Sequence, residues 1–342
     1  MELLSDLPAM NVQNLGLLLN DGSRWKYTDR DNNDLETFEN MQFAIRAALA
    51  RCASLRSLNI DDNGHFLEST QHDRFEWEQY PISQCKLESF TLRGFDYDEW
   101  IREDVLFRIL SQARIIKITV YPLMLERDVI CLMKGAKDTL EECKFSLREE
   151  RDSSIKNIQQ IILPKLIKFD LSYLAAGDGR GSVRAFQNVS FQWPKIKELT
   201  FRGEGKLKLY EKLIPISLES LAFRKIQQLP LNKIISFLKK RSSLKKLAIE
   251  DLKEDTDTLL YEILINLPHI PLEELEIVGV RGIHSKNLID FIKQRRKNPL
   301  STPIKRLQLT FPSRIMLDSK TLEWLNEEIE DFKCEVSPKR HR

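Results

Sequence analysis

One pattern of apolar positions recurs along the chain: an apolar residue, two variable residues, a second apolar residue, one variable residue and a third apolar residue. The second and third apolar positions alternate with polar ones, which is typical of a short strand with one buried face. The first position anchors the turn that leads into the strand. Copies begin at Leu55, Leu87, Ile115, Leu140, Leu166, Ile196, Leu218, Leu244, Leu272 and Ile304, and Val12-Leu15-Leu17 is expected to open the series.

Segments with helical spacing separate several of these strands. Apolar residues fall three or four positions apart in 35–48, 104–110, 231–238 and 259–264. A strand and a helix per copy cannot bury their apolar faces alone, so stacked copies must share one core and one parallel sheet. An ordinary α/β domain is the rival interpretation, but its strands would have varied patterns.

The distance between copies identifies the kind of repeat. It lies mostly at or just above the roughly 20–29 residues of a leucine-rich repeat. The predicted fold class is therefore α/β, a leucine-rich-repeat solenoid of about 10–12 irregular repeats. We expect a curved horseshoe with the parallel sheet on its concave face and the helices on its convex face.

The turn after each strand departs from the leucine-rich-repeat consensus. Asn63 fits the consensus asparagine in one copy. Six other copies have an apolar residue there: Phe95, Leu123, Leu174, Ile226, Leu252 and Val280. We expect no continuous asparagine ladder, and turns that are packed by apolar side chains.

The repeats resemble those of a known family. The phrases SLRSLNIDDN, LKKLAIEDL and LEELEIVGV are similar to the leucine-rich regions of fungal-type F-box/LRR proteins, over roughly residues 10–312. The resemblance implies an intracellular protein-recognition module, often the substrate receptor of a ubiquitin ligase, with a Skp-type adaptor among its partners. The F-box itself is not evident, and no adaptor-binding residues are carried over.

We expect a single solenoid domain over residues 1–342, with repeats in about 10–336 and a disordered basic tail at 337–342. Three longer stretches, 18–34, 64–84 and 175–192, interrupt the repeats, and the last contains the glycine cluster Gly177–Gly181. Long loops inside a compact solenoid are often functional or disordered. The segment 175–192 leaves a strand end and could cover the rim of the concave face. Drift in a tolerant surface loop is the alternative.

Composition limits the function classes. Lys and Arg number 53 and Asp and Glu 51, for a formal charge of +2, so no global field favours nucleic acid or a membrane. The five cysteines form no C-x-x-C and are expected to be reduced thiols, as in a cytoplasmic or nuclear protein. The sequence shows neither a signal peptide nor an apolar run of the 18 or more residues that span a membrane.

Motifs of enzymes are missing from the sequence. The glycine cluster is followed by no Gly-Lys-Ser/Thr and is not a dinucleotide fingerprint. The five histidines show no zinc spacing, and a solvated loop explains His65, His72 and Asp73 better than a shared metal does. We therefore expect no enzyme, no catalytic residue, no cofactor and no metal site.

The concave face is the expected binding site. Residues between the apolar positions should point away from the core. In the middle repeats these include cationic and aromatic side chains, whereas Asp61, Asp62, Glu250, Asp251, Glu274 and Glu276 make the ends acidic. We hypothesise that the middle binds an acidic or phosphorylated segment of a protein partner; ordinary surface charge is the alternative. The candidate residues are Arg93, Lys117, Tyr121, Lys144, Lys168, Tyr173, Arg202, Arg224 and Lys225.

Two other function classes stay open. The basic middle and tail suggest a nucleic-acid or chromatin-associated factor, but the near-neutral composition argues against nucleic acid. The basic runs at 239–246 and 293–297 lie at expected helix ends, where cations complement the helix dipole. The third class is a regulator of a small GTPase, although no catalytic asparagine or arginine is recognisable.

Overall fold

The computed structural model describes residues 13–19, 54–62, 86–94, 113–148, 159–174, 182–183, 186, 188–204, 206–207, 213–215, 217–226, 231–250, 255–312 and 317–337. The chain divides into two compact units. Unit 1 comprises Met1–Ile155 and Gln160–Leu166, and unit 2 comprises Lys156–Gln159 and Ile167–Arg342. The single solenoid domain expected from the sequence stays a prediction.

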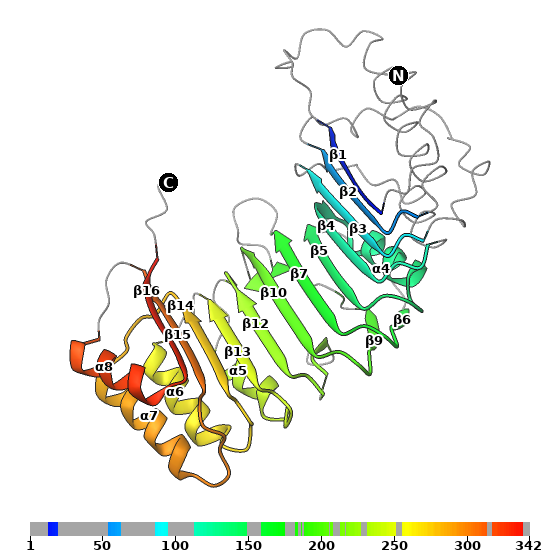
Figure 1. Ribbon diagram of the computed structural model, residues 1–342. Coiled ribbons are helices and arrows are strands. Elements are labelled where there is room, and N and C mark those ends of the chain that lie inside the picture. Colours follow the sequence, from blue (N-terminus) through cyan, green and yellow to red (C-terminus); the bar gives the residue numbers. More distant parts are fainter. Residues whose placement is uncertain are drawn as a thin grey trace, which may run out of the picture. The chain divides into compact units, whose positions relative to one another are not determined.

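Unit 1 is built on parallel strands that pair in chain order (Figure 1). Equivalent apolar positions lie in register, so that Phe90 stands between Leu58 and Ile118. Helix α4 (Glu126–Gly135) connects the last two strands and buries Val129 and Met133. The strands are β1 (Asn14–Leu19), β2 (Ser57–Asp62), β3 (Ser89–Gly94), β4 (Lys117–Met124) and β5 (Glu142–Arg148), and β6 (Gln159–Ile162) follows in the chain.

Unit 2 repeats the same parallel arrangement. Its main strands, in order of pairing, are β7 (Lys168–Leu174), β10 (Glu198–Glu204), β12 (Ser220–Arg224), β13 (Lys246–Glu250), β14 (Glu274–Val278), β15 (Arg306–Phe311) and β16 (Asp331–Val336). Helices α5 (Leu231–Leu238), α6 (Thr256–Asn266), α7 (Ser285–Lys297) and α8 (Ser319–Glu328) connect successive strands from β12 onward and cover one face (Figure 1). The short strands β8 (Ser182–Val183) and β11 (Lys206–Leu207) pair with each other, and β9 (Val189–Gln192) precedes β10.

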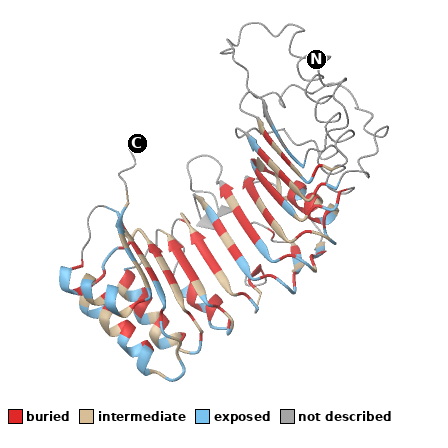
Figure 2. Cartoon of the chain, in the orientation of Figure 1, coloured by how far each residue is buried: buried red, intermediate tan, exposed pale blue. Residues whose placement is uncertain are grey.

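The core consists of the recurring apolar positions. Leu244, Leu247 and Ile249 are at most 2 % exposed, and the other described copies are buried in the same way (Figure 2). Burial of each such side chain contributes roughly 1.5–3 kcal/mol. The predicted strands are therefore confirmed at every copy of the pattern, and the fold is consistent with a leucine-rich-repeat-like solenoid.

The predicted helices are confirmed where the structure describes them. The spacing in 231–238 and 259–264 corresponds to α5 and α6. The expected helices 35–48 and 104–110, the loop 64–84, most of 18–34, the glycine cluster 177–181 and the tail beyond Ser337 lie outside the described residues. Ile226 and Val280 are buried, as expected for turns packed by apolar side chains.

An aromatic cluster fills the space beside β7 on the core side. Phe186 is fully buried, and its ring centroid lies 6.3 Å from that of Phe169 on β7. The ring centroid of Trp193 lies 5.5 Å from that of Phe169, and Trp193 stacks on Phe191 with the centroids 4.5 Å apart. The described part of 175–192 therefore packs against the core instead of covering the sheet's other face.

Two buried arginines bind turn carbonyls. Arg295, in the last turn of α7, is fully buried and donates from Nε to the Thr302 carbonyl oxygen (3.1 Å) and from Nη2 to that of Ile270 (3.1 Å). Burial lowers the pKa of Arg295 to about 10. Arg241, after α5, donates to the Ile214 carbonyl oxygen in a similar way. One cation of each basic run thus supports the fold.

No described helix is long and apolar enough to cross a membrane. Within the described residues, histidine, cysteine and carboxylate side chains also form no group of three or more that could hold a metal ion. Cys131, Cys143 and Cys334 are not joined in disulfides.

Candidate partner-binding surface

The face of each sheet opposite the core carries the polar residues of the repeated pattern. We call this face the strand surface: the side chains directly before, between and directly after the second and third apolar positions of each copy. Parallel register places equivalent side chains side by side, about 4.8 Å apart. Lys246, Glu274 and Arg306, for example, form one row across β13, β14 and β15.

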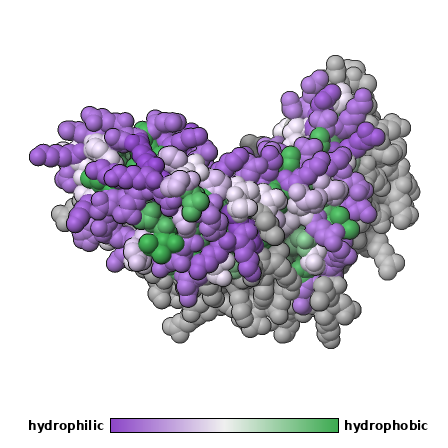
Figure 3. Space-filling view, turned by 90° about the horizontal axis from the view of Figure 1, so that it is seen from below, coloured by the Kyte–Doolittle hydropathy of each residue, from purple (hydrophilic) through white to green (hydrophobic). Residues whose placement is uncertain are grey.

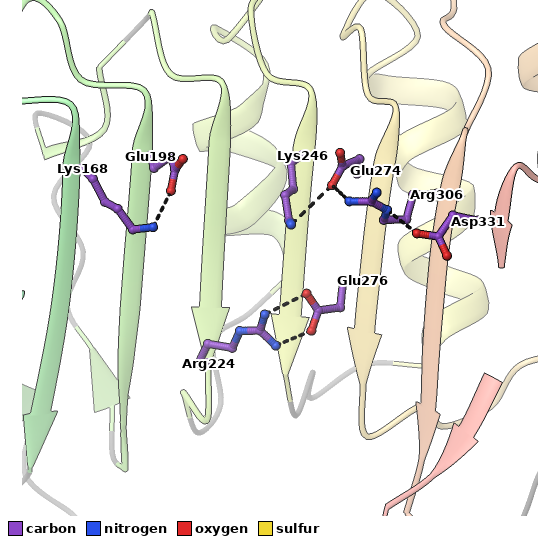
Figure 4. Close-up of polar contacts among 8 residues, drawn as sticks. All are labelled: Lys168, Glu198, Arg224, Lys246, Glu274, Glu276, Arg306 and Asp331. Atoms are coloured by element: carbon purple, nitrogen blue, oxygen red, sulfur yellow. Dashed lines mark hydrogen bonds and ion pairs between the residues drawn. The ribbon is translucent and has the colours of Figure 1, made fainter. Parts of the chain in front are cut away.

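This row in unit 2 is a chain of ion pairs (Figure 4). Lys246 Nζ lies 3.3 Å from Glu274 Oε2, and Arg306 Nη1 lies 3.2 Å from the same oxygen. Arg306 Nε lies 2.6 Å from Asp331 Oδ2. The side chains are 32–50 % exposed, so each pair adds little stability. The ion pairs matter more for recognition, because a cation that already has a carboxylate beside it is less available to an anionic ligand.

Arg224 makes a more buried ion pair that crosses a strand. Its Nη1 and Nη2 donate to Oε1 and Oε2 of Glu276 at 2.5 and 2.7 Å. The pair bridges from β12 to β14 over β13, where Ala248 lies in register with Glu276 and is fully buried (Figure 4). The small alanine leaves room for the guanidinium. Arg224 is therefore a structural residue whose charge is neutralised.

The other predicted residues of unit 2 are also engaged or turned away. Lys168 Nζ lies 2.8 Å from Glu198 Oε2, and Arg202 Nε lies 3.1 Å from Oδ1 of the buried Asp170. Lys225 is half-buried in the turn after β12, with a φ of 55°.

Tyr173 lies on the core side of β7. Its position along the strand has the same parity as Phe169 and Leu171, and the side chain is only 2 % exposed, which raises the pKa of its phenol. Gly203 on β10 packs beside it, and a Cβ there would lie 2.1 Å from the Tyr173 carbonyl oxygen. Tyr173 therefore supports the sheet and does not belong to its open surface.

In unit 1 the structure brings three predicted residues together around one ring. The guanidinium carbon of Arg93 lies 5.6 Å from the centroid of Tyr121, and Lys144 Nζ lies 4.5 Å from it. Tyr121 is 39 % exposed. Among the described residues, neither Arg93 nor Lys144 has a carboxylate within ion-pair distance, whereas Lys117 is bound to Glu142 at 2.9 Å. We call Arg93, Tyr121 and Lys144 the cationic cluster.

A bulge in β4 positions the ring of the cationic cluster. Thr119 is in register with Lys144 on β5, but the next pair is Leu123 with Ser146, so extra residues of β4 bulge out at Tyr121-Pro122. Pro122 has no N–H to lose from the ladder. Bulges re-aim side chains and are common beside functional sites.

The chemistry of the cationic cluster favours an anion. Each cation–π contact contributes about 0.5–1 kcal/mol at an exposed site, while two cations on one ring repel each other. An anionic ligand would relieve that repulsion and accept hydrogen bonds from both side chains. Tyr and Arg are also residue types enriched at binding hot spots.

Sequence reasoning placed these cations along the strands but did not show which of them are paired, and the binding role of the surface stays a prediction. The sequence also places Glu142, Asp170 and Glu198 between the apolar positions of the middle repeats. It does not show that each of these carboxylates pairs with one particular cation. The available signal was charge alternating in sign at equivalent positions of neighbouring copies. Asp331 was missed because its strand follows a further copy of the apolar pattern, Ile329-Phe332-Cys334, that was not counted.

Comparisons with known proteins find matches among solved structures. No protein-family model matches the chain, and no curated protein matches it. Among solved structures, a chain from the crystal structure of the Rad7 and Elc1 complex in yeast is similar, with a TM-score of 0.45 and 12 % sequence identity. The match covers 100 % of this chain and 81 % of that chain. A likeness at this score carries no argument about function.

Proposed function

We propose that the protein is a non-enzymatic recognition scaffold that binds an acidic or phosphorylated segment of a partner protein at the cationic cluster. The observation that carries the proposal is the contrast on the strand surface. Most of its cations stand beside carboxylates, whereas Arg93 and Lys144 flank an exposed ring without one among the described residues. In a leucine-rich-repeat horseshoe this surface would be the concave face.

The size of the cationic cluster favours a protein segment as the ligand. One guanidinium, one ammonium and one aromatic ring suit a single phosphate or a pair of carboxylates on a peptide. A nucleic acid instead requires a series of cations along its backbone, and the ion-paired rows of unit 2 offer few free cations for that purpose.

The narrower form of the proposal is substrate recognition in an SCF-type ubiquitin ligase, in the cytoplasm or nucleus. It rests on the resemblance of the repeats to F-box/LRR proteins. Affinity capture of the tagged chain from native cell extract, followed by mass spectrometry, tests it directly. Recovery of a Skp-type adaptor and a cullin would support it, and partners recovered without them would leave a free-standing scaffold.

The same capture tests the cationic cluster. The double variant R93E/K144E should reduce recovery of the principal partner by about tenfold or more, as expected for hot-spot residues. A matched control is K86E/K137E, which makes the same change in net charge at two exposed lysines of unit 1 outside the cluster. Phosphatase treatment of the extract separates a phosphorylated segment from one rich in Asp and Glu.

Both variants must fold for the comparison to be valid, which circular dichroism and thermal unfolding establish. Recovery with R93E/K144E at the wild-type level would place the binding site elsewhere on the protein. Loss of the partner with the control as well would mean that net charge, not the cluster, governs capture.

A further inference from the structure

The strand β16 ends the parallel sheet of unit 2 and has one free edge in the described part of the chain. It pairs with β15 alone, through bonds such as Asp331 N–H to the Lys305 carbonyl oxygen (3.1 Å) and Ser337 N–H to that of Phe311 (2.7 Å). Backbone groups alternate in direction along a strand. The N–H and C=O groups of Phe332, Cys334 and Val336 therefore point outward, and such an edge is a template for another strand.

The two faces of β16 differ in chemistry. Phe332, Cys334 and Val336 are in register with Leu307, Leu309 and Phe311, so they extend the core side of the sheet. Val336 is 42 % exposed, although its neighbour Phe311 is fully buried. This apolar row is left partly uncovered at the end of the sheet.

Lys333 and Glu335 lie on the strand surface of β16, and both are exposed. Their neighbours in register on β15 are Gln308 and Thr310, which carry no charge. Neither Lys333 nor Glu335 has an ion-pair partner among the described residues, while Asp331 on the same strand is bound to Arg306. The two charges are therefore available to a partner on the free edge.

The sequence of β16 is complementary to itself. Around Cys334, the residues one position away are Lys333 and Glu335, of opposite charge, and those two positions away are Phe332 and Val336, both apolar. We propose that β16 pairs antiparallel with β16 of a second copy of this chain, about a two-fold axis that passes beside Cys334. A symmetric dimer requires such a self-complementary patch.

The backbone is compatible with this register. With the axis at Cys334, the outward N–H and C=O groups of Phe332 face those of Val336 in the other copy, and Cys334 faces Cys334, so each outward group gains a partner. A shift of one residue would set outward groups against inward ones. An axis at Phe332 would oppose Lys333 to Asp331, which Arg306 already binds, and would leave Val336 uncovered.

The side chains fit the same register. Lys333 of each copy stands opposite Glu335 of the other, in a closely spaced pair without backbone bonds. On the core side, Phe332 and Val336 cover each other across the axis. The dimer would thus close the open end of the core and use both free charges at once.

Analytical ultracentrifugation of the full chain over about 1–100 μM tests the dimer. The wild type should show a concentration-dependent equilibrium between monomer and dimer. Either single reversal, K333E or E335K, places like charges opposite each other twice and should raise the dissociation constant by about tenfold or more. The double variant K333E/E335K restores opposite charges and should restore the dimer.

Matched controls are K320E and E330K, which make the same charge changes at exposed residues of unit 2 outside β16. A second readout is a short bismaleimide, which should join Cys334 to Cys334 in the wild type and lose that linked peptide in C334S. A monomer throughout the concentration range would overturn the proposal. A dimer that both single reversals leave unchanged, or that the double variant does not restore, would also overturn it.

Discussion

Whether a charged side chain on the strand surface is available for binding depends on its neighbour in register. Arg93 and Arg224 have the same position in their repeats, directly after the third apolar residue. Arg224 reaches Glu276 across a small alanine. Arg93 instead meets the ring of Tyr121. A guanidinium at a fixed place in the repeat is therefore structural in one copy and open to a ligand in another.

Replacing Arg224 should affect stability more than recognition. Its ion pair is mostly buried, with side-chain exposures of 23 % for Arg224 and 17 % for Glu276, so Arg224→Ala leaves a desolvated carboxylate behind. We expect the free energy of unfolding to fall by about 1–3 kcal/mol, measured by urea denaturation. The exposed Lys245→Ala serves as the control and should change it by about 0.5 kcal/mol or less.

A double-mutant cycle isolates the pair itself. If Arg224→Ala and Glu276→Ala have additive effects on the free energy of unfolding, the two side chains are not coupled and the structural role of Arg224 is wrong. Capture of a partner at the cationic cluster should be unaffected by Arg224→Ala at temperatures where the variant is folded.

At the scale of elements, the start of α8 depends on one carboxylate. Asp318 accepts hydrogen bonds from the Thr321 backbone N–H at 2.8 Å and from the Thr321 hydroxyl at 2.9 Å. A bond from the Ser285 side chain, followed by these two, lowers the pKa of Asp318 to about 2. Because Ser285 begins α7, this carboxylate also ties α8 to the preceding helix.

The stabilisation by Asp318 should vary with pH. A carboxyl with a lowered pKa in the folded protein stabilises fully above its ordinary value of 3.8 and loses this effect as pH falls toward about 2. We expect Asp318→Asn to melt at a lower temperature than the wild type at pH 6, and the difference to shrink as pH falls below 3.8 and through about 2. A difference that stays constant over this range would show that the negative charge of Asp318 is not involved.

Local patterns predicted the elements better than they predicted side-chain partners. The alternating triplet located β1 to β5, β7, β10 and β12 to β15, because burial of two apolar positions per copy is a short-range requirement. The bulge at Tyr121-Pro122 could not be anticipated, since register between β4 and β5 depends on packing between copies. The copy Ile329-Phe332-Cys334 was not predicted, so β16 was not predicted either. Asp331, which pairs with Arg306, and the free edge of β16 were therefore missed.

At the scale of the whole molecule, the sequence indicated the repeat architecture. It did not indicate how many cations of the middle repeats are neutralised by ion pairs with carboxylates. Comparing equivalent positions of successive repeats shows which residues are charged, but not how far apart their side chains lie. The structure adds that Lys117, Lys168 and Arg202 each have a carboxylate within 3.1 Å. In the described repeats, positive and negative charges therefore balance within individual rows of the strand surface, as they do in the whole sequence.

This pairing predicts weak binding to nucleic acid. Arg93 and Lys144 offer about two cations to a phosphate backbone, so the logarithm of the association constant for a DNA duplex should fall with the logarithm of salt concentration with a slope near −2. Fluorescence anisotropy with a labelled duplex at several salt concentrations measures that slope, and R93E/K144E should abolish what binding there is. A slope of −6 or steeper would reveal a broad basic surface, because each released counterion reports one neutralised phosphate. Such a result would favour a nucleic-acid-associated factor over a scaffold for an acidic protein segment.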